Sequence, residues 1–127
     1  MMTDKELQGA RVKLASETAE LKRLTEAHEQ QAAVVADLEA QAAATLENAT
    51  LAELTAQAGR VAEAQAKLGA ARAVLAELER RMGVAKGRLR RAEIEVLAVE
   101  ADIEDAELRA VEERILAGLS KLQPDVE

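Results

Sequence analysis

The sequence contains no cysteine and no phenylalanine, tyrosine or tryptophan. Without cysteine the chain has neither a disulfide framework nor a thiolate nucleophile. Compact cores of this length normally use large aromatic side chains to fill their volume, so the absence of aromatics favours a thin, extended core. No apolar run approaches the ~18 residues that a membrane span needs, and the first residues lack the apolar segment of a secretory signal. We therefore expect a soluble cytoplasmic protein that does not enter the membrane.

Basic residues are outnumbered by acidic ones, which gives a net charge of −7 at pH 7. Nonspecific binding to nucleic acid is therefore not the default expectation. Proline occurs once and glycine six times in 127 residues. The abundant residues are alanine, leucine, glutamate, arginine and lysine, a mixture that is typical of long helices. The composition predicts an all-α fold.

A seven-residue repeat runs through the second half of the chain. In its first position, a, stand Leu54, Val61, Leu68, Leu75, Met82, Leu89, Val96, Ile103 and Ala110. Three residues later, at position d, stand mostly small residues: Ala64, Ala71, Leu78, Ala85, Ala92, Val99 and Ala106. Apolar a and d positions form the seam of a coiled coil, which is a surface for another helix.

A similar but weaker stripe begins at Leu7 in the first half. Polar residues interrupt its seam at Glu17, His28 and Gln31. Thr3 and Thr50 each precede a glutamate by three residues, which is the spacing of a helix-starting capping box. The sequence thus predicts two helices, one starting after each threonine.

We expect a single coiled-coil domain over residues 1–127. Helix 1 should cover about 4–45, a turn about 46–50 with Asn48 as a left-handed cap, and helix 2 about 51–122. Two long helices joined by a short turn fold back antiparallel. The predicted fold is an elongated antiparallel helical hairpin with a long second helix, self-associating, and with a frayed tail after residue 122.

The alternative is a three-helix bundle with a turn at residues 83–87, where Gly83 and Gly87 lie. The repeat crosses this stretch without a slip, and both glycines occupy outward positions of the seam register. Because a loop would usually reset the register, we favour a continuous helix in which each glycine costs about 1 kcal/mol relative to alanine.

A hairpin turning near residue 48 would place His28 opposite Gly69 and leave helix 2 uncovered beyond about residue 93. The uncovered segment is rich in apolar residues that span more than one stripe. A helix with so wide an apolar arc needs a further partner. We predict self-association through an interface of Ile94, Leu97, Ile103, Leu108, Val111 and Ile115.

A basic stretch precedes this segment and consists of Arg80, Arg81, Lys86, Arg88, Arg90 and Arg91. The residues that follow are strongly acidic, so an antiparallel homodimer centred near residues 93–97 would pair basic with acidic blocks. Binding of nucleic acid or an anionic surface is an alternative, and so is a charged face that is merely solvated.

Catalytic and metal-binding patterns are weak in this sequence. The one histidine, His28, has no cysteine or ligand cluster near it. The glycines form no phosphate-binding motif, and carboxylate pairs such as Glu100 and Glu104 lack a pocket or a nucleophile. We expect no enzyme activity, no cofactor and no metal.

The most specific functional expectation is a structural or protein–protein interaction protein that forms a homodimer or a higher homo-oligomer. Acidic, alanine-rich helical rods also suit assembly scaffolds or chaperones, such as phage-assembly scaffolds or the hairpin stalk proteins of secretion systems, although this is an analogy of architecture alone. A nucleic-acid-associated protein that uses residues 80–91 is the third alternative.

Overall fold

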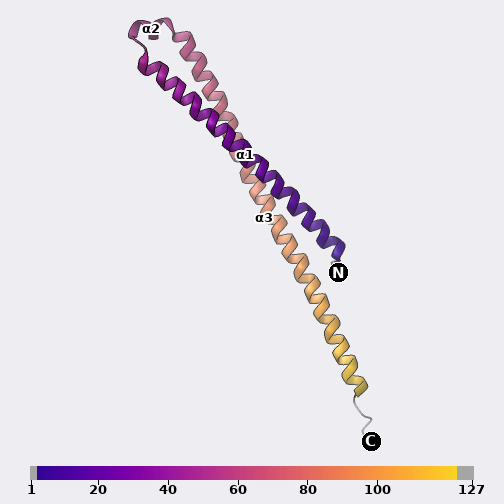
Figure 1. Cartoon of the computed structure of the whole chain (residues 1–127). Helices are drawn as coiled ribbons and strands as arrows, with labels where there is room; N and C mark the ends of the chain where they lie inside the picture. The colour runs from indigo at the N-terminus through magenta and orange to yellow at the C-terminus, as the bar shows by residue number, and fades with distance from the viewer. Residues whose placement is uncertain (1–2, 123–127) are drawn as a thin grey trace. The chain divides into compact units, whose positions relative to one another are not determined.

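The computed structural model describes residues 3–122. Within that range the chain forms three helices and no strand: α1 (Asp4–Asn48), α2 (Leu51–Ala56) and α3 (Ala58–Leu122). Figure 1 shows α1 and α3 as two long helices joined through α2. The predicted all-α helical hairpin is confirmed. The predicted fraying of the tail after residue 122 lies outside the described residues.

Helix α1 starts where the sequence predicts. The Glu6 amide donates to the Thr3 hydroxyl oxygen at 3.3 Å, which satisfies a backbone donor that has no partner inside the helix. The helix continues to Asn48, beyond the predicted end at about residue 45. No non-glycine residue in the described chain has a positive φ, so the prediction of a left-handed cap at Asn48 is wrong.

The chain reverses through Ala49 and the short helix α2. A complete capping box starts α2, because the Glu53 amide donates to the Thr50 hydroxyl oxygen and the Thr50 amide donates to the Glu53 carboxylate. The predicted continuous helix 2 is locally interrupted at Gln57, between α2 and α3. The interruption is small, since the Gln57 amide still donates to the Glu53 carbonyl and the Gln57 carbonyl accepts from the Val61 amide.

Helix α3 runs through Gly83 and Gly87 without a break. The alternative of a three-helix bundle with a turn at residues 83–87 is therefore wrong. A Cβ added at either glycine would meet no atom within 4 Å. Both glycines therefore face open space and are not required by close packing. Ala85 and Ala92, the d residues nearest to Gly87, are buried at 4% and 1% exposure, and burial of the seam outweighs the low helix propensity of the two glycines.

The contacts divide the chain into two units. Among the described residues, unit 1 contains residues 3–18 and 88–122, and unit 2 contains residues 19–87. Each unit holds a part of α1 and a part of α3, so each has its own section of the coiled-coil seam.

In unit 2 the core is a small cluster of Val35, Leu68 and Ala71, against which Leu38 and Leu75 pack. All five residues occupy a or d positions. Removing these side chains from water stabilises the pairing of α1 with α3 by roughly 25 cal/mol per Å² of buried apolar surface.

Polar residues of the unit 2 seam also reach across to α3. The Gln31 side-chain amide donates to the Ala71 carbonyl at 3.0 Å, and His28 Nε2 lies 3.2 Å from Glu79 Oε1. The expectation that His28 faces Gly69 is therefore wrong. The reversal extends to Gln57 instead of ending near residue 50, so residues of α1 face later residues of α3 than a turn at 46–50 would allow.

In unit 1 the core consists of Ala10, Val96 and Val99, and Leu7, Leu14 and Ile103 pack against it. Two ion pairs flank this cluster, Arg11 to Glu100 and Lys13 to Glu95, each at 3.3 Å. The start of α1 thus covers α3 as far as Ile103. This corrects the expectation that α3 is uncovered beyond about residue 93.

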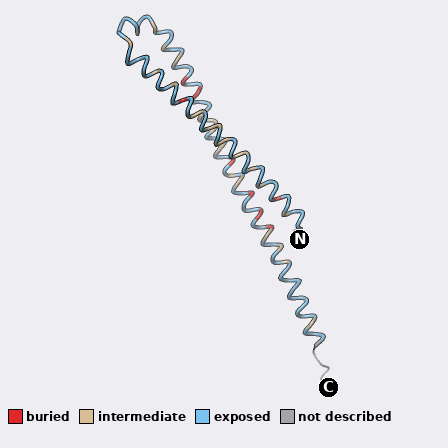
Figure 2. Tube along the Cα trace, in the orientation of Figure 1, coloured by how far each residue is buried: buried red, intermediate tan, exposed pale blue. Residues whose placement is uncertain are grey.

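Every buried residue of the described chain lies at an a or d position of the predicted repeats, and Figure 2 shows these residues as isolated points along the helices. Alanine and valine predominate among them: Ala10, Val35, Leu68, Ala71, Ala85, Ala92, Val96 and Val99. Small seam residues allow the two helix backbones to approach closely. The seam therefore buries few and mostly small side chains.

Candidate interaction surface

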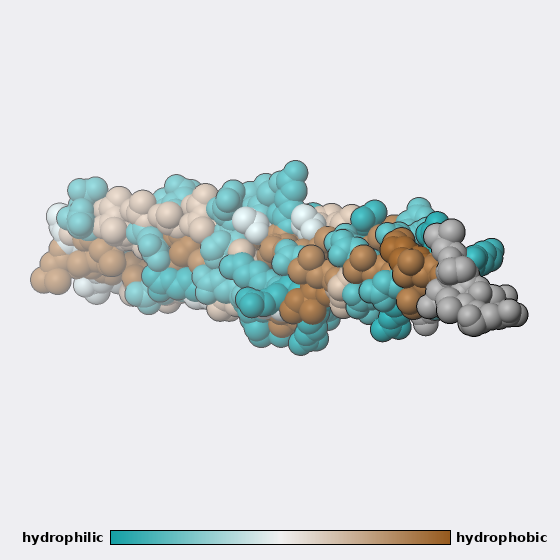
Figure 3. Space-filling view, turned by 90° about the horizontal axis from the view of Figure 1, so that it is seen from below, coloured by the Kyte–Doolittle hydropathy of each residue, from teal (hydrophilic) through white to brown (hydrophobic). Residues whose placement is uncertain are grey.

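The outer face of α3 in unit 1 carries large apolar side chains that α1 does not cover. Ile94, Leu97, Leu108, Val111 and Ile115 expose 57%, 64%, 60%, 44% and 56% of their surface. Figure 3 shows such hydrophobic surface as separate patches between hydrophilic side chains. We call these five residues the outer stripe. A run of exposed large apolar residues on one helix face is the usual mark of an interaction site.

The outer stripe follows a heptad spacing of its own. Its members occupy the f and b positions of the α3 register, at residues 94, 97, 108, 111 and 115, and Ala101 and Glu104 occupy the f and b positions between them. Steps of three and four residues keep one face of a helix in line. The stripe is a second seam, on the side of α3 away from the first.

The two seams occupy the same stretch of α3 but lie on different sides of the helix. Val96 and Val99 are buried against α1, whereas Leu97, which lies between them in the sequence, points outward and is largely exposed. The exposure of Ile94 and Leu97 therefore does not result from a missing part of α1. Helical geometry directs these side chains away from α1 even where the two helices are in contact.

Five of the six predicted interface residues form the outer stripe, and their role in association stays a prediction. The sixth, Ile103, packs against the intrachain cluster of unit 1 instead. The apolar residues after position 93 form a broad arc in the sequence, so the prediction did not separate the two faces of the helix. The steps of three and four residues between positions 94 and 115 were the sequence signal that could have identified the outer stripe as a separate face.

Beyond the part of α3 that contacts α1, Leu116 and Leu119 are also exposed. They lie at positions g and c of the register and so widen the apolar face at the end of α3. The a and d positions here hold Ala106, Ala110 and Glu113, which are small or charged. The end of α3 is therefore most apolar on its outer side.

In unit 2, two members of the predicted basic stretch are engaged by one carboxylate. Arg80 Nη2 lies 2.7 Å from Glu77 Oε1, and Arg81 Nε lies 3.0 Å from the same oxygen. Hydrogen bonds from Arg80 and then from Arg81 lower the pKa of Glu77 to about 2. This local network partly neutralises the start of the basic stretch.

The other basic residues of the stretch are exposed and fall into both units: Lys86 in unit 2, and Arg88, Arg90 and Arg91 in unit 1. Two acids that the predicted homodimer assigned to a second copy, Glu95 and Glu100, instead contact α1 of the same chain. Fewer acidic residues are therefore available for the expected pairing of basic and acidic blocks around residues 93–97.

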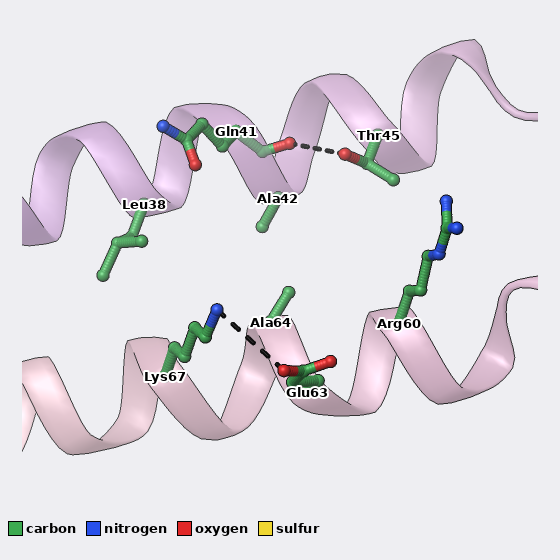
Figure 4. A pocket seen from close by; sticks show the side chains of 8 residues that line it. All are labelled: Leu38, Gln41, Ala42, Thr45, Arg60, Glu63, Ala64 and Lys67. Atoms are coloured by element: carbon green, nitrogen blue, oxygen red, sulfur yellow. Dashed lines mark hydrogen bonds and ion pairs between the residues drawn. The ribbon is translucent and has the colours of Figure 1, made fainter.

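Near the chain reversal in unit 2, α1 and α3 lie further apart (Figure 1) and leave an open hollow of about 220 Å³. Figure 4 shows Ala42 and Ala64 facing each other across it, with the charged side chains of Arg60, Glu63 and Lys67 on the α3 side. The hollow exists because both facing seam residues are alanines. Glu63 pairs with Lys67 along the helix at 4.0 Å, and this arrangement holds no nucleophile with a base beside it.

The described residues contain neither a metal-binding cluster nor a helix that could span a membrane. Among residues 3–122, no group of three histidine, cysteine, aspartate or glutamate side chains is placed to hold a metal ion. None of the helices in that range combines the length and the hydropathy required to cross a bilayer.

Comparison of the chain with known protein families, with curated proteins and with solved structures finds no match.

Proposed function

We propose that this chain is a structural protein that homo-oligomerises in the cytoplasm through the outer stripe of α3, and that it presents its helices to other proteins. The observation that supports this proposal is the second heptad of large, exposed apolar residues from Ile94 to Ile115. Covering such a face with another helix removes it from water, which is the main driving force of association. We assign the chain no catalytic role.

The nucleic-acid alternative has weaker support. Arg80 and Arg81 already contact Glu77, and the chain has no aromatic side chain on which a base could stack. A net charge of −7 would also repel a phosphate backbone. A protein partner fits the outer stripe better than a polyanion does.

The proposal is tested by Leu108→Asp. Leu108 is 60% exposed, so the variant should keep its intrachain seam, while a carboxylate placed in a helix interface would be buried without a partner. Light scattering coupled to size exclusion should give a mass of at least two chains of 13.6 kDa for the unaltered protein and of one chain for the variant. Circular dichroism should show the same helix content for both.

Val74→Asp is the matched control, because Val74 is an exposed valine of α3 in unit 2, outside the outer stripe. Its mass should equal that of the unaltered protein. A monomeric unaltered protein, or a Leu108→Asp variant of unchanged mass, would refute the proposal. Ile103→Asp is not a suitable test, since Ile103 packs inside unit 1 and its loss would disturb folding and association together.

A further inference from the structure

The large residues of the second seam are confined to one part of α3. The f and b positions from Gly59 to Arg90 hold only glycine, alanine and arginine, and the first large apolar residue at these positions is Ile94. An occupant of the outer stripe must therefore lie along residues 94 onward, which belong to unit 1. Because this is one face of one helix, a helix is the element that fits it.

Charges beside the stripe change sign along the helix. The e position borders the stripe on one side, and it holds Glu93, Glu100, Glu107, Arg114 and Lys121 in that order. The c position borders the other side and holds Asp105 and Glu112 in the same region. In helix pairs these flanking residues select the orientation of the partner.

A parallel second copy would be repelled by these charges. In a parallel pair, each e residue faces the c residue five positions later in the other helix. Glu100 would then face Asp105, and Glu107 would face Glu112. Each repulsion would occur twice because the pair is symmetric.

In an antiparallel pair, e residues face e residues, so the acidic part of one flank meets the basic part of the other. We propose that a second copy of this chain docks antiparallel on the outer stripe, with Glu107 of each chain facing Arg114 of the other. Within residues 3–121, neither Glu107 nor Arg114 forms an ion pair, and Arg114 donates a hydrogen bond to the Ala110 carbonyl of its own helix. Both groups are therefore available to a second chain.

The same alignment matches the apolar residues of the stripe. Leu108 of each chain faces Val111 of the other, which places two reciprocal apolar layers about the symmetry axis. Ile115 of each chain meets the aliphatic stem of Glu104 of the other chain, and the Glu104 carboxylate extends into water. On the c flank, Asp105 of each chain faces Glu112 of the other, and these two carboxylates repel. The antiparallel pair therefore has less repulsion between acidic residues than the parallel pair, but some remains.

This inference rests on the proposed function. Charge-reversal variants test the antiparallel orientation separately from association itself. Glu107→Lys and Arg114→Glu should each raise the dimer dissociation constant on the order of tenfold, because two exposed attractive pairs become repulsive. The double variant Glu107→Lys/Arg114→Glu should return to within about threefold of the unaltered protein. Sedimentation equilibrium measures the three constants.

Arg109→Glu is the matched control for Arg114→Glu, since it makes the same charge change at a position away from the stripe and should leave the dissociation constant unchanged. A parallel dimer gives the opposite sign for Glu107→Lys, because the introduced ammonium group would then face Glu112 and tighten association. Tighter or unchanged association of that variant, or no recovery in the double variant, would overturn the antiparallel arrangement while the proposed function stands. A monomeric unaltered protein would instead overturn the proposed function.

Discussion

At the scale of single residues, the clearest electrostatic feature is the carboxylate of Glu77 held by two arginines. The hydrogen bond from Arg80 contributes most to lowering its pKa, followed by that from Arg81. The three residues lie three and four positions apart on one helix, so the network forms within α3 without help from another element. Because all three side chains are exposed, the network stabilises the helix only slightly.

We predict that Glu77 titrates near pH 2, well below its unfolded value of 4.5. A carboxyl with a lowered pKa in the folded state stabilises the fold above its unfolded pKa, and this contribution disappears as the pH falls from about 4.5 to about 2. Carbon-detected NMR of the Glu77 side chain measures the midpoint. Arg80→Gln should raise the midpoint and Arg88→Gln should not; equal midpoints in all three proteins would contradict the prediction.

Individual residues also show where sequence reasoning succeeds. Ala85, Ala92 and Val99 are buried as the heptad predicts, because burial on a helix follows from spacing alone. The ion pairs Arg11–Glu100 and Arg72–Glu39 were not predicted. Such pairs join exposed side chains on two helices, so they depend on a register that the sequence pattern does not contain.

At the scale of the helices, α3 tolerates glycine because its glycines lie away from the first seam. We predict that Gly83→Ala raises the free energy of unfolding by about 1 kcal/mol, since alanine has the higher helix propensity and the added Cβ meets no atom within 4 Å. Urea denaturation followed by circular dichroism measures the change.

The reverse substitution nearby provides the control. Ala85 is 4% exposed in the seam, so Ala85→Gly should lower the free energy of unfolding by about 1 kcal/mol or more, through propensity and lost contacts together. A destabilising Gly83→Ala would show that something packs closely against this position.

The sequence predicted the helix starts at the capping residues Thr3 and Thr50 well. It predicted the end of α1 and the interruption at Gln57 less well. The hydroxyl and the glutamate of the capping box at Thr50 are a specific local signal. The interruption at Gln57 has no comparable signal, although Gly59 lowers the helix propensity just after it. Because the reversal therefore extends further along the chain, the pairing of α1 with α3 could not be deduced from the two heptads alone.

At the scale of the whole molecule, the proposed association should couple to folding. An assembly that binds only folded chains is stabilised by raising the protein concentration. We predict that the midpoint of thermal unfolding rises with concentration for the unaltered protein and does not change for Leu108→Asp. Circular dichroism over a hundredfold range of concentration measures both, and a constant midpoint for the unaltered protein would contradict the coupling.

The restriction of burial to two positions in seven also determines how freely this sequence can change over evolutionary time. Along the first seam, a substitution at a or d alters a buried contact, whereas most substitutions at the outward positions of unit 2 alter only solvated side chains. Leu108 and Val111 also lie at outward positions, so folding of the single chain places little constraint on them. Retention of large apolar residues there in diverging descendants of this sequence would record selection for binding on that face, and drift to polar residues would record its loss.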